Sequence, residues 1–189
     1  MGIIAVLSMS VVMACGESAA RLESDYPIYS AALQSLIDST APSRLLIRRV
    51  AAVNAYEGDL YDTSDVRVFQ EMAPAMDTRL LAHAAARLTE KPQLLDSFTV
   101  KGSHEFVADS VWERLVHMPM LPAFQLQDSV FGSGATVVCL TPPARMHDQA
   151  LLYIAEGCFD RGSIGGQYYF LKRIAGRWTV SATVPMSIN

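Results

Sequence analysis

Cysteine is the side chain of this chain with the greatest capacity for covalent chemistry, and it occurs at Cys15, Cys139 and Cys158. A thiol acts as a nucleophile only as a thiolate, which needs a base or a positive charge beside it. Arg161 follows Cys158 closely, but no histidine lies near that cysteine in the sequence. We therefore interpret Cys158 as a structural or free thiol and assign no catalytic residue to the chain.

Cys15 has a different context, because it ends an uncharged apolar run from Ile3 to Ala14. The run is shorter than the roughly 20 residues that a membrane-crossing helix needs, and its length is typical of the apolar centre of an export signal. The sequence Val12-Met13-Ala14-Cys15 resembles the lipobox of bacterial lipoproteins. That resemblance implies cleavage before Cys15 and acylation of the new N-terminus, which gives the two-chain anchor that a stable membrane attachment requires. The alternative is an ordinary cleaved secretory signal with Cys15 incidental.

The resemblance to lipoproteins divides the chain into a signal peptide (1–14), a lipidated tether (15–24) and one α+β domain (25–189). We expect an exported protein that is anchored in the bacterial cell envelope through lipid at Cys15. Gly16 stands where an aspartate would retain a lipoprotein in the inner membrane. In a Gram-negative host the expected location is therefore the outer membrane, facing the periplasm.

Charge and composition exclude several classes of function. The net charge is −4, from 15 Lys and Arg against 19 Asp and Glu, and the charges are scattered. Nucleic-acid binding needs a concentrated basic patch, so we expect no nucleic-acid partner. The histidines do not have the spacing of a two-histidine metal site, and no serine has the glycine flanks of a nucleophile elbow. We therefore expect neither a metal nor another cofactor, and an enzyme is the less favoured class. The histidines are His83, His104, His117 and His147.

The periodicity of apolar residues predicts helices in the N-terminal half and strands in the C-terminal half. The fold class that follows is α+β, with N-terminal helices packed on one face of a curved antiparallel sheet, a four-stranded meander at the C-terminus. Pro119 and Pro122 predict an irregular connection before this sheet. Helices are expected over about 26–39 and 75–88 and near 110–115, and strands over 45–53, 136–141, 149–156, 167–174 and 177–184.

The last two strands form the clearest local prediction, because Ala175-Gly176 can make a two-residue hairpin turn. Such a turn pairs Arg173 with Trp178 and places Trp178 on a core face. The face assigned to the core carries Tyr169, Leu171, Trp178, Val180, Ala182 and Val184. The opposite face mixes aromatic side chains with hydroxyls, as a half-open concave surface does.

This mixed face supplies the candidate ligand-binding residues. Tyr168 and Phe170 stand among threonine and serine side chains, and Tyr153 lies on the preceding strand. We expect these three aromatic residues to contact a ligand or partner. The alternative is that helices cover the face and bury them.

The same strands predict that Cys139 and Cys158 are not paired. If residues 136–141 turn directly into 149–156, Cys139 faces Leu151. Cys158 then lies roughly 23 Å farther along, at about 3.3 Å per residue. A disulfide requires Cα atoms within about 7 Å, so both thiols are expected to be free.

Two further resemblances concern the fold. Residues 149–153, Cys158, 165–171 and 176–178 resemble a set of uncharacterised secreted or lipid-anchored bacterial proteins, which implies a fold and an envelope location. In that set the loop between the two strands often holds a second cysteine, which this chain lacks. The order of elements also looks like the cone-shaped folds typified by nuclear transport factor 2, which enclose a pocket between sheet and helices; this is an analogy of fold alone.

The leading functional hypothesis is a non-enzymatic binding role for a small apolar ligand, a peptide or another envelope protein. Alternatives are a pocket enzyme of the nuclear transport factor 2 type and a structural or inhibitory partner protein without a pocket. A buried and partnered Asp or His in a deep pocket would favour the enzyme. An apolar pocket would favour the binding protein, and an exposed apolar patch would favour the partner protein.

Overall fold

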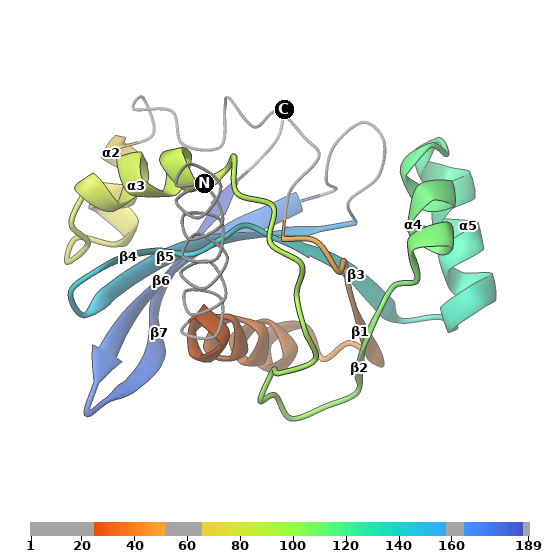
Figure 1. Cartoon of the computed structure of the whole chain (residues 1–189), viewed down its shortest axis with the longest axis horizontal. Helices are drawn as coiled ribbons and strands as arrows, with labels where there is room; N and C mark the ends of the chain where they lie inside the picture. The colour runs from red at the N-terminus through yellow and green to blue at the C-terminus, as the bar shows by residue number, and fades with distance from the viewer. Residues whose placement is uncertain (1–24, 52–65, 158–164, 187–189) are drawn as a thin grey trace, which may run out of the picture.

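The computed structural model describes residues 25–51, 66–157 and 165–186, and it has the α+β composition expected from the sequence (Figure 1). A helix over residues 25–40 opens this part of the chain. The elements that follow are β1 (Arg44–Ile47), α2 (Val66–Met72), α3 (Arg79–Arg87), β2 (His104–Phe106), α4 (Asp109–Val116), α5 (Met120–Phe131), β3 (Ala135–Leu140), β4 (Ala144–Met146), β5 (Gln149–Glu156), β6 (Gly165–Ile174) and β7 (Arg177–Met186). None of the helices in this part of the chain combines the length and apolarity that a membrane crossing requires.

The described strands form one mixed sheet in the order β2-β1-β3-β5-β6-β7. The predicted four-stranded antiparallel meander is confirmed as β3, β5, β6 and β7. β1 extends it by pairing in parallel with β3 on one side and with β2 on the other. β4 pairs with the first residues of β5, whereas β3 pairs with the last ones. The break between β3 and β4 falls at Thr141-Pro142-Pro143, where prolines cannot donate ladder hydrogen bonds.

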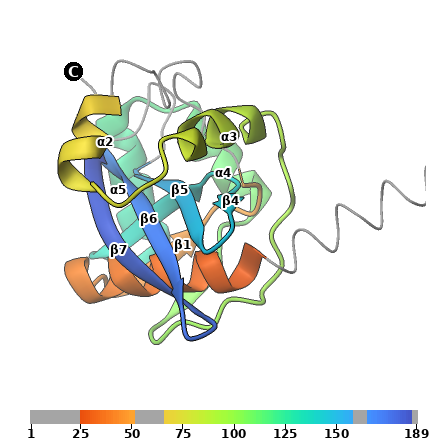
Figure 2. The same cartoon turned by 90° about the vertical axis from the view of Figure 1, so that its left-hand side faces the viewer.

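Helices cover both faces of the sheet, which corrects the expectation that they pack on one face (Figures 1 and 2). The helix over 25–40 buries Ile28 and Leu33 against Leu152 and Leu171 on one face. α2 and α3 bury their apolar side chains on the other face. The physical reason is the apolar character of β5 on both sides, since its six central residues are all buried.

A β-bulge changes the face of the last residues of β7. The pairs Arg173–Trp178 and Leu171–Val180 form as predicted, but Phe170 then pairs with Ala182, so that Ser181 is the extra residue. One extra residue reverses the inward and outward alternation. The assignment of Ala182 and Val184 to the face of Trp178 is therefore wrong, and both pack with the α2 and α3 side.

The predicted register of Cys139 is also wrong, because β4 occupies the position that a direct turn would have given to β3. Cys139 pairs with Ala155, not with Leu151. Its thiol is buried and free, as predicted. Cys158 lies outside the described residues.

A long connection between α3 and β2 is tied to the helix over 25–40 by side-chain acceptors one helical turn apart. The Tyr26 hydroxyl accepts a hydrogen bond from the Leu95 N–H at 2.6 Å, and the Ser30 hydroxyl accepts one from the Thr99 N–H at 2.9 Å. Gln34 Oε1 accepts a third from the Lys101 N–H at 2.6 Å. We call residues 95–101 the strap, since they lie along this helix without forming a strand.

The helices α4 and α5 lie at the β1–β3 side of the molecule (Figure 1). The sequence predicted an irregular connection over 119–122, but α5 begins at Met120. The prediction was wrong because proline is tolerated in the first turn of a helix, where its missing N–H would have no partner.

Candidate functional site

The three aromatic residues predicted to contact a ligand lie in the core. Tyr153, Tyr168 and Phe170 are buried, at 2 % exposure or less. Phe69 of α2 packs on Tyr168 with ring centroids 4.8 Å apart, and a methyl group at Gly166 would collide with the Tyr153 hydroxyl. The expected half-open surface is therefore closed by α2, whose Phe69 covers Tyr168. Cys15, the predicted lipidation site, lies outside the described residues.

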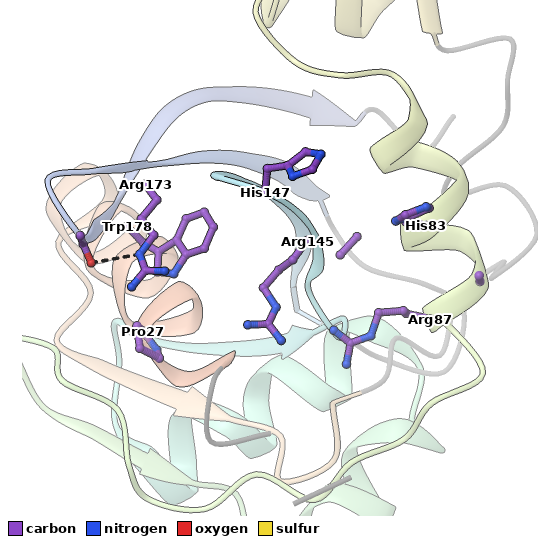
Figure 3. Close-up of a pocket in the computed structure, with 10 residues that line it drawn as sticks. Pro27, His83, Arg87, Arg145, His147, Arg173 and Trp178 are labelled. Atoms are coloured by element: carbon purple, nitrogen blue, oxygen red, sulfur yellow. Dashed lines mark hydrogen bonds between the residues drawn. The ribbon is translucent and has the colours of Figure 1, made fainter. Parts of the chain in front are cut away.

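A pocket of about 800 Å³ lies at the end of the sheet where the β4–β5 turn and the β6–β7 hairpin meet α3 and residue 27 (Figure 3). Its volume is within the range of small-molecule sites. Five of its lining side chains carry basic groups, and one is a tryptophan. They are His83, Arg87, Arg145, His147, Arg173 and Trp178.

Tight turns bring these side chains together. Ala175 and Gly176 have φ of 48° and 82°, so both central residues of the hairpin turn have the positive φ of a type I′ turn. This turn places Arg173 directly opposite Trp178. His147 also has a positive φ, of 52°, in the two-residue connection between β4 and β5. Arg145, His147 and Arg173 are thus fixed by a strand or a local turn, and His83 and Arg87 are fixed by α3.

Further hydrogen bonds hold the rims of the pocket in place. The Arg173 N–H donates to the Asp148 carbonyl at 2.7 Å, which joins the hairpin to the β4–β5 turn. The Gln149 side chain accepts from the Asp77 N–H at 2.9 Å and donates to the Ala75 carbonyl at 3.1 Å. The segment before α3 is therefore attached to the start of β5. The pocket is largely preformed.

Arg87 is held on all sides by the protein. Its Nη2 donates to Asp25 Oδ2 at 3.2 Å and to Glu90 Oε2 at 2.7 Å. Its Nε donates to Glu90 at 3.1 Å, and its Nη1 donates to the Pro143 carbonyl. Each guanidinium nitrogen has a partner. Arg87 therefore gives the pocket wall positive charge and structural support, and it offers a ligand few free hydrogen-bond donors.

Arg145 has the opposite character. Its Nε lies 3.3 Å from Asp25 Oδ1, which orients the guanidinium, and its side chain is 33 % exposed. Neither Nη atom has a hydrogen bond to the described part of the chain. Figure 3 shows its guanidinium projecting into the pocket beside that of Arg87. Arg145 therefore presents the pocket with an oriented pair of donors.

Asp25 lies behind these two arginines and does not line the pocket. Its side chain is 1 % exposed, and Oδ1 accepts no hydrogen bond despite its nearness to Arg145. Burial raises the pKa of the carboxyl above its ordinary value, and the charges of Arg87 and Arg145 offset this only in part. Asp25 is thus a buried support for the arginines, held at an electrostatic cost.

The pocket has a positive balance of charge. Arg87, Arg145 and Arg173 line it, and the carboxylates paired with the first two are Asp25 and Glu90, which leaves one net positive charge with neutral histidines. No acidic side chain is among the described residues that line it. Arg173 is exposed and donates from Nε to the Gly176 carbonyl at 3.3 Å. Side chains of this charge and exposure can form charged hydrogen bonds with an anion.

Sequence reasoning missed this site and placed Trp178 in the core. Trp178 shares a face with Leu171, as predicted, but it is only half-buried and borders the pocket. The basic residues come from α3, β4, the β4–β5 turn and β6, and their clustering depends on the tertiary fold. The one available signal was the cross-strand pairing of Arg173 with Trp178 in a hairpin that the sequence did predict.

Comparison of the chain with models of protein families, with curated proteins and with solved structures found no match.

Proposed function

We propose that this chain is an envelope-anchored binding protein that holds a small anionic ligand and does not convert it chemically. The proposed site is the pocket lined by Arg87, Arg145 and Arg173, which we call the arginine pocket. The observation that carries the proposal is the Arg145 guanidinium, oriented by Asp25 and presenting its Nη donors to an 800 Å³ pocket. The proposed anchor is lipid at Cys15. It is supported by the apolar run that ends at this residue.

The chemistry of the pocket favours an anion over the small apolar ligand expected from the sequence. Guanidinium groups form short, charge-assisted hydrogen bonds with carboxylate and phosphate groups, often in pairs. An apolar ligand would cover the donors of Arg145 without replacing the water that they bind, which costs about 1–3 kcal/mol or more for a charged group. The ligand must therefore bring oxygen acceptors to this wall.

A binding role is favoured over the pocket enzyme. Asp25 is the buried, partnered carboxyl that such an enzyme would use, but Arg87 and Arg145 separate it from the pocket. A general base must be within hydrogen-bond reach of the proton that it removes. His83 and His147 do line the pocket, but neither has a hydrogen bond to a described residue that would orient it as a base.

Isothermal titration of the detergent-solubilised full chain with a panel of small carboxylates and phosphates tests the proposal. We expect at least one anion to bind, and Arg145→Gln to weaken it about 10- to 100-fold, the effect of losing a charged hydrogen bond. Arg44→Gln is the matched control, because Arg44 is an exposed arginine paired with Glu105 on β2 and does not line the pocket. Absence of binding by every anion, or equal loss in both variants, would overturn the proposal. Turnover of a bound anion would favour the enzyme.

A further inference from the structure

Trp178 gives the arginine pocket an apolar, flat wall next to its charged one. The indole is half-buried, and it lies opposite Arg173 across the hairpin. Figure 3 shows the indole of Trp178 and the guanidinium of Arg145 entering the same space from two sides. Tryptophan side chains bind flat groups through offset stacking, which contributes about 0.5–1.5 kcal/mol beyond the burial of area.

The other wall recognises one planar anionic group. The two Nη atoms of a guanidinium match the two oxygens of a carboxylate in a single plane. Asp25 Oδ1 attracts this guanidinium from its Nε side, at 3.3 Å and without a hydrogen bond, which leaves the Nη edge for the pocket. A carboxylate bound there would be coplanar with Arg145.

The balance of charge limits the ligand to one negative charge. Three arginines and two carboxylates leave one net positive charge. Asp77, which lies near His147 at this rim, is paired with Arg79 and therefore adds no net charge. A dianion would leave one charge without compensation, which is costly in a partly desolvated site.

We infer that the ligand of this pocket is a monocarboxylate carried on a flat apolar group, with the carboxylate on the Nη edge of Arg145 and the flat group against the Trp178 indole. The inference rests on the proposed function and specifies its ligand class. It assigns Trp178 and Arg145 as the two residues that determine specificity.

The test uses 1-naphthoate as the probe and three comparison compounds that each change one property. Cyclohexanecarboxylate keeps the charge without the flat ring, naphthalene-1-carboxamide keeps the ring without the charge, and 1-naphthyl phosphate adds a second charge. Titration of the full chain should show 1-naphthoate binding at least fivefold more tightly than the first and at least tenfold more tightly than the second. The phosphate should bind no more tightly than the carboxylate.

Two substitutions locate the preferences. Trp178→Leu should reduce the preference for 1-naphthoate over cyclohexanecarboxylate to within twofold, and Arg145→Gln should remove the preference for carboxylate over amide. Should the leucine variant fail to fold, Trp178→Phe provides the test. Its only remaining tryptophan, Trp112, is buried in α4. Binding of 1-naphthoate should change the fluorescence of Trp178 in the wild-type chain, and in the phenylalanine variant this change should disappear while calorimetry still detects the ligand.

The outcomes distinguish this inference from the proposed function. Tighter binding of the phosphate, or a ring preference that survives Trp178→Leu, overturns the ligand class. If Arg145→Gln still removes anion binding in that case, the anion-binding function stands. If neither these compounds nor the wider panel of anions binds, both are wrong.

Discussion

Asp25 Oδ2 lies 3.2 Å from Arg87 Nη2, a residue 62 positions later in the chain. This pair joins the helix over 25–40 on one face of the sheet to α3 on the other. The same carboxylate orients Arg145 of β4. One buried acid therefore connects both layers of helices to the pocket.

The pH dependence of the free energy of unfolding should show that burying the charged Asp25 carboxylate destabilises the fold. Burial raises the pKa of Asp25 in the folded state above its ordinary value of 3.8. The folded state then binds the proton more tightly than the unfolded state. The stability that the protonated carboxyl contributes is present below pH 3.8 and is lost as pH rises through the folded pKa.

Asp25→Asn, which stays neutral, tests this sign. Measured by urea unfolding at several pH values between 4 and 7, the wild-type chain should lose stability relative to the variant as pH rises. A variant that becomes progressively less stable than wild type over this range would show that the arginines outweigh burial.

Phe170→Ser should destabilise the protein by at least the roughly 3–5 kcal/mol that loss of a buried phenylalanine costs. Phe170 is 1 % exposed and packs in the cluster beneath α2 and α3. Ile174→Ser is the control, because Ile174 lies on the same strand and is 60 % exposed. Its effect on the free energy of unfolding should stay within about 0.5 kcal/mol. If the Phe170 variant were as stable as this control, the sheet face that carries Tyr168 and Phe170 would again be a candidate binding surface.

Lipidation at Cys15 predicts a defined mature chain. The intact mass of protein from the membrane fraction should correspond to a chain that begins at Cys15 with acyl groups added. Cys15→Ser should abolish the added mass and release the protein from membranes. A soluble wild-type chain cleaved at another position would contradict the proposed anchor.

The Cys139 thiol should be protected by the fold. It is buried in β3, between β1 and β5. In the Cys15→Ser, Cys158→Ser variant, a thiol reagent should modify no group in the native protein and one group in denaturant. Rapid modification of the native protein would show that this part of the sheet opens readily.

The β6–β7 hairpin shows which part of the fold the sequence can predict. Its turn depends on two adjacent residues, Ala175 and Gly176, and the pairing as far as Leu171 and Val180 follows from that turn alone. The bulge at Ser181 was not predictable in this way. Val180 packs in the apolar cluster on one face of the sheet and Ala182 in the cluster on the other. Because helices cover both faces, the apolar pattern of β7 alone does not show on which face each side chain lies.

The candidate site was beyond sequence reasoning for a related reason. Arg87 and Arg145 look like solvated charges in the sequence, and only the tertiary fold brings both to Asp25. The parallel pairing of β1 with β3 likewise joins Leu45 to Thr136, which lies about half the chain length away in the sequence. The local periodicity of apolar residues does not predict contacts between residues so far apart in the sequence.

The strap has a consequence for how the molecule opens. The backbone N–H groups of Leu95, Thr99 and Lys101 have no strand partner, and the side chains of Tyr26, Ser30 and Gln34 accept their hydrogen bonds instead. Three amides so distant from the helix in sequence depend on its being docked. In native-state hydrogen exchange, the amides of Leu95, Thr99 and Lys101 should therefore become exposed together with this helix as one cooperative unit.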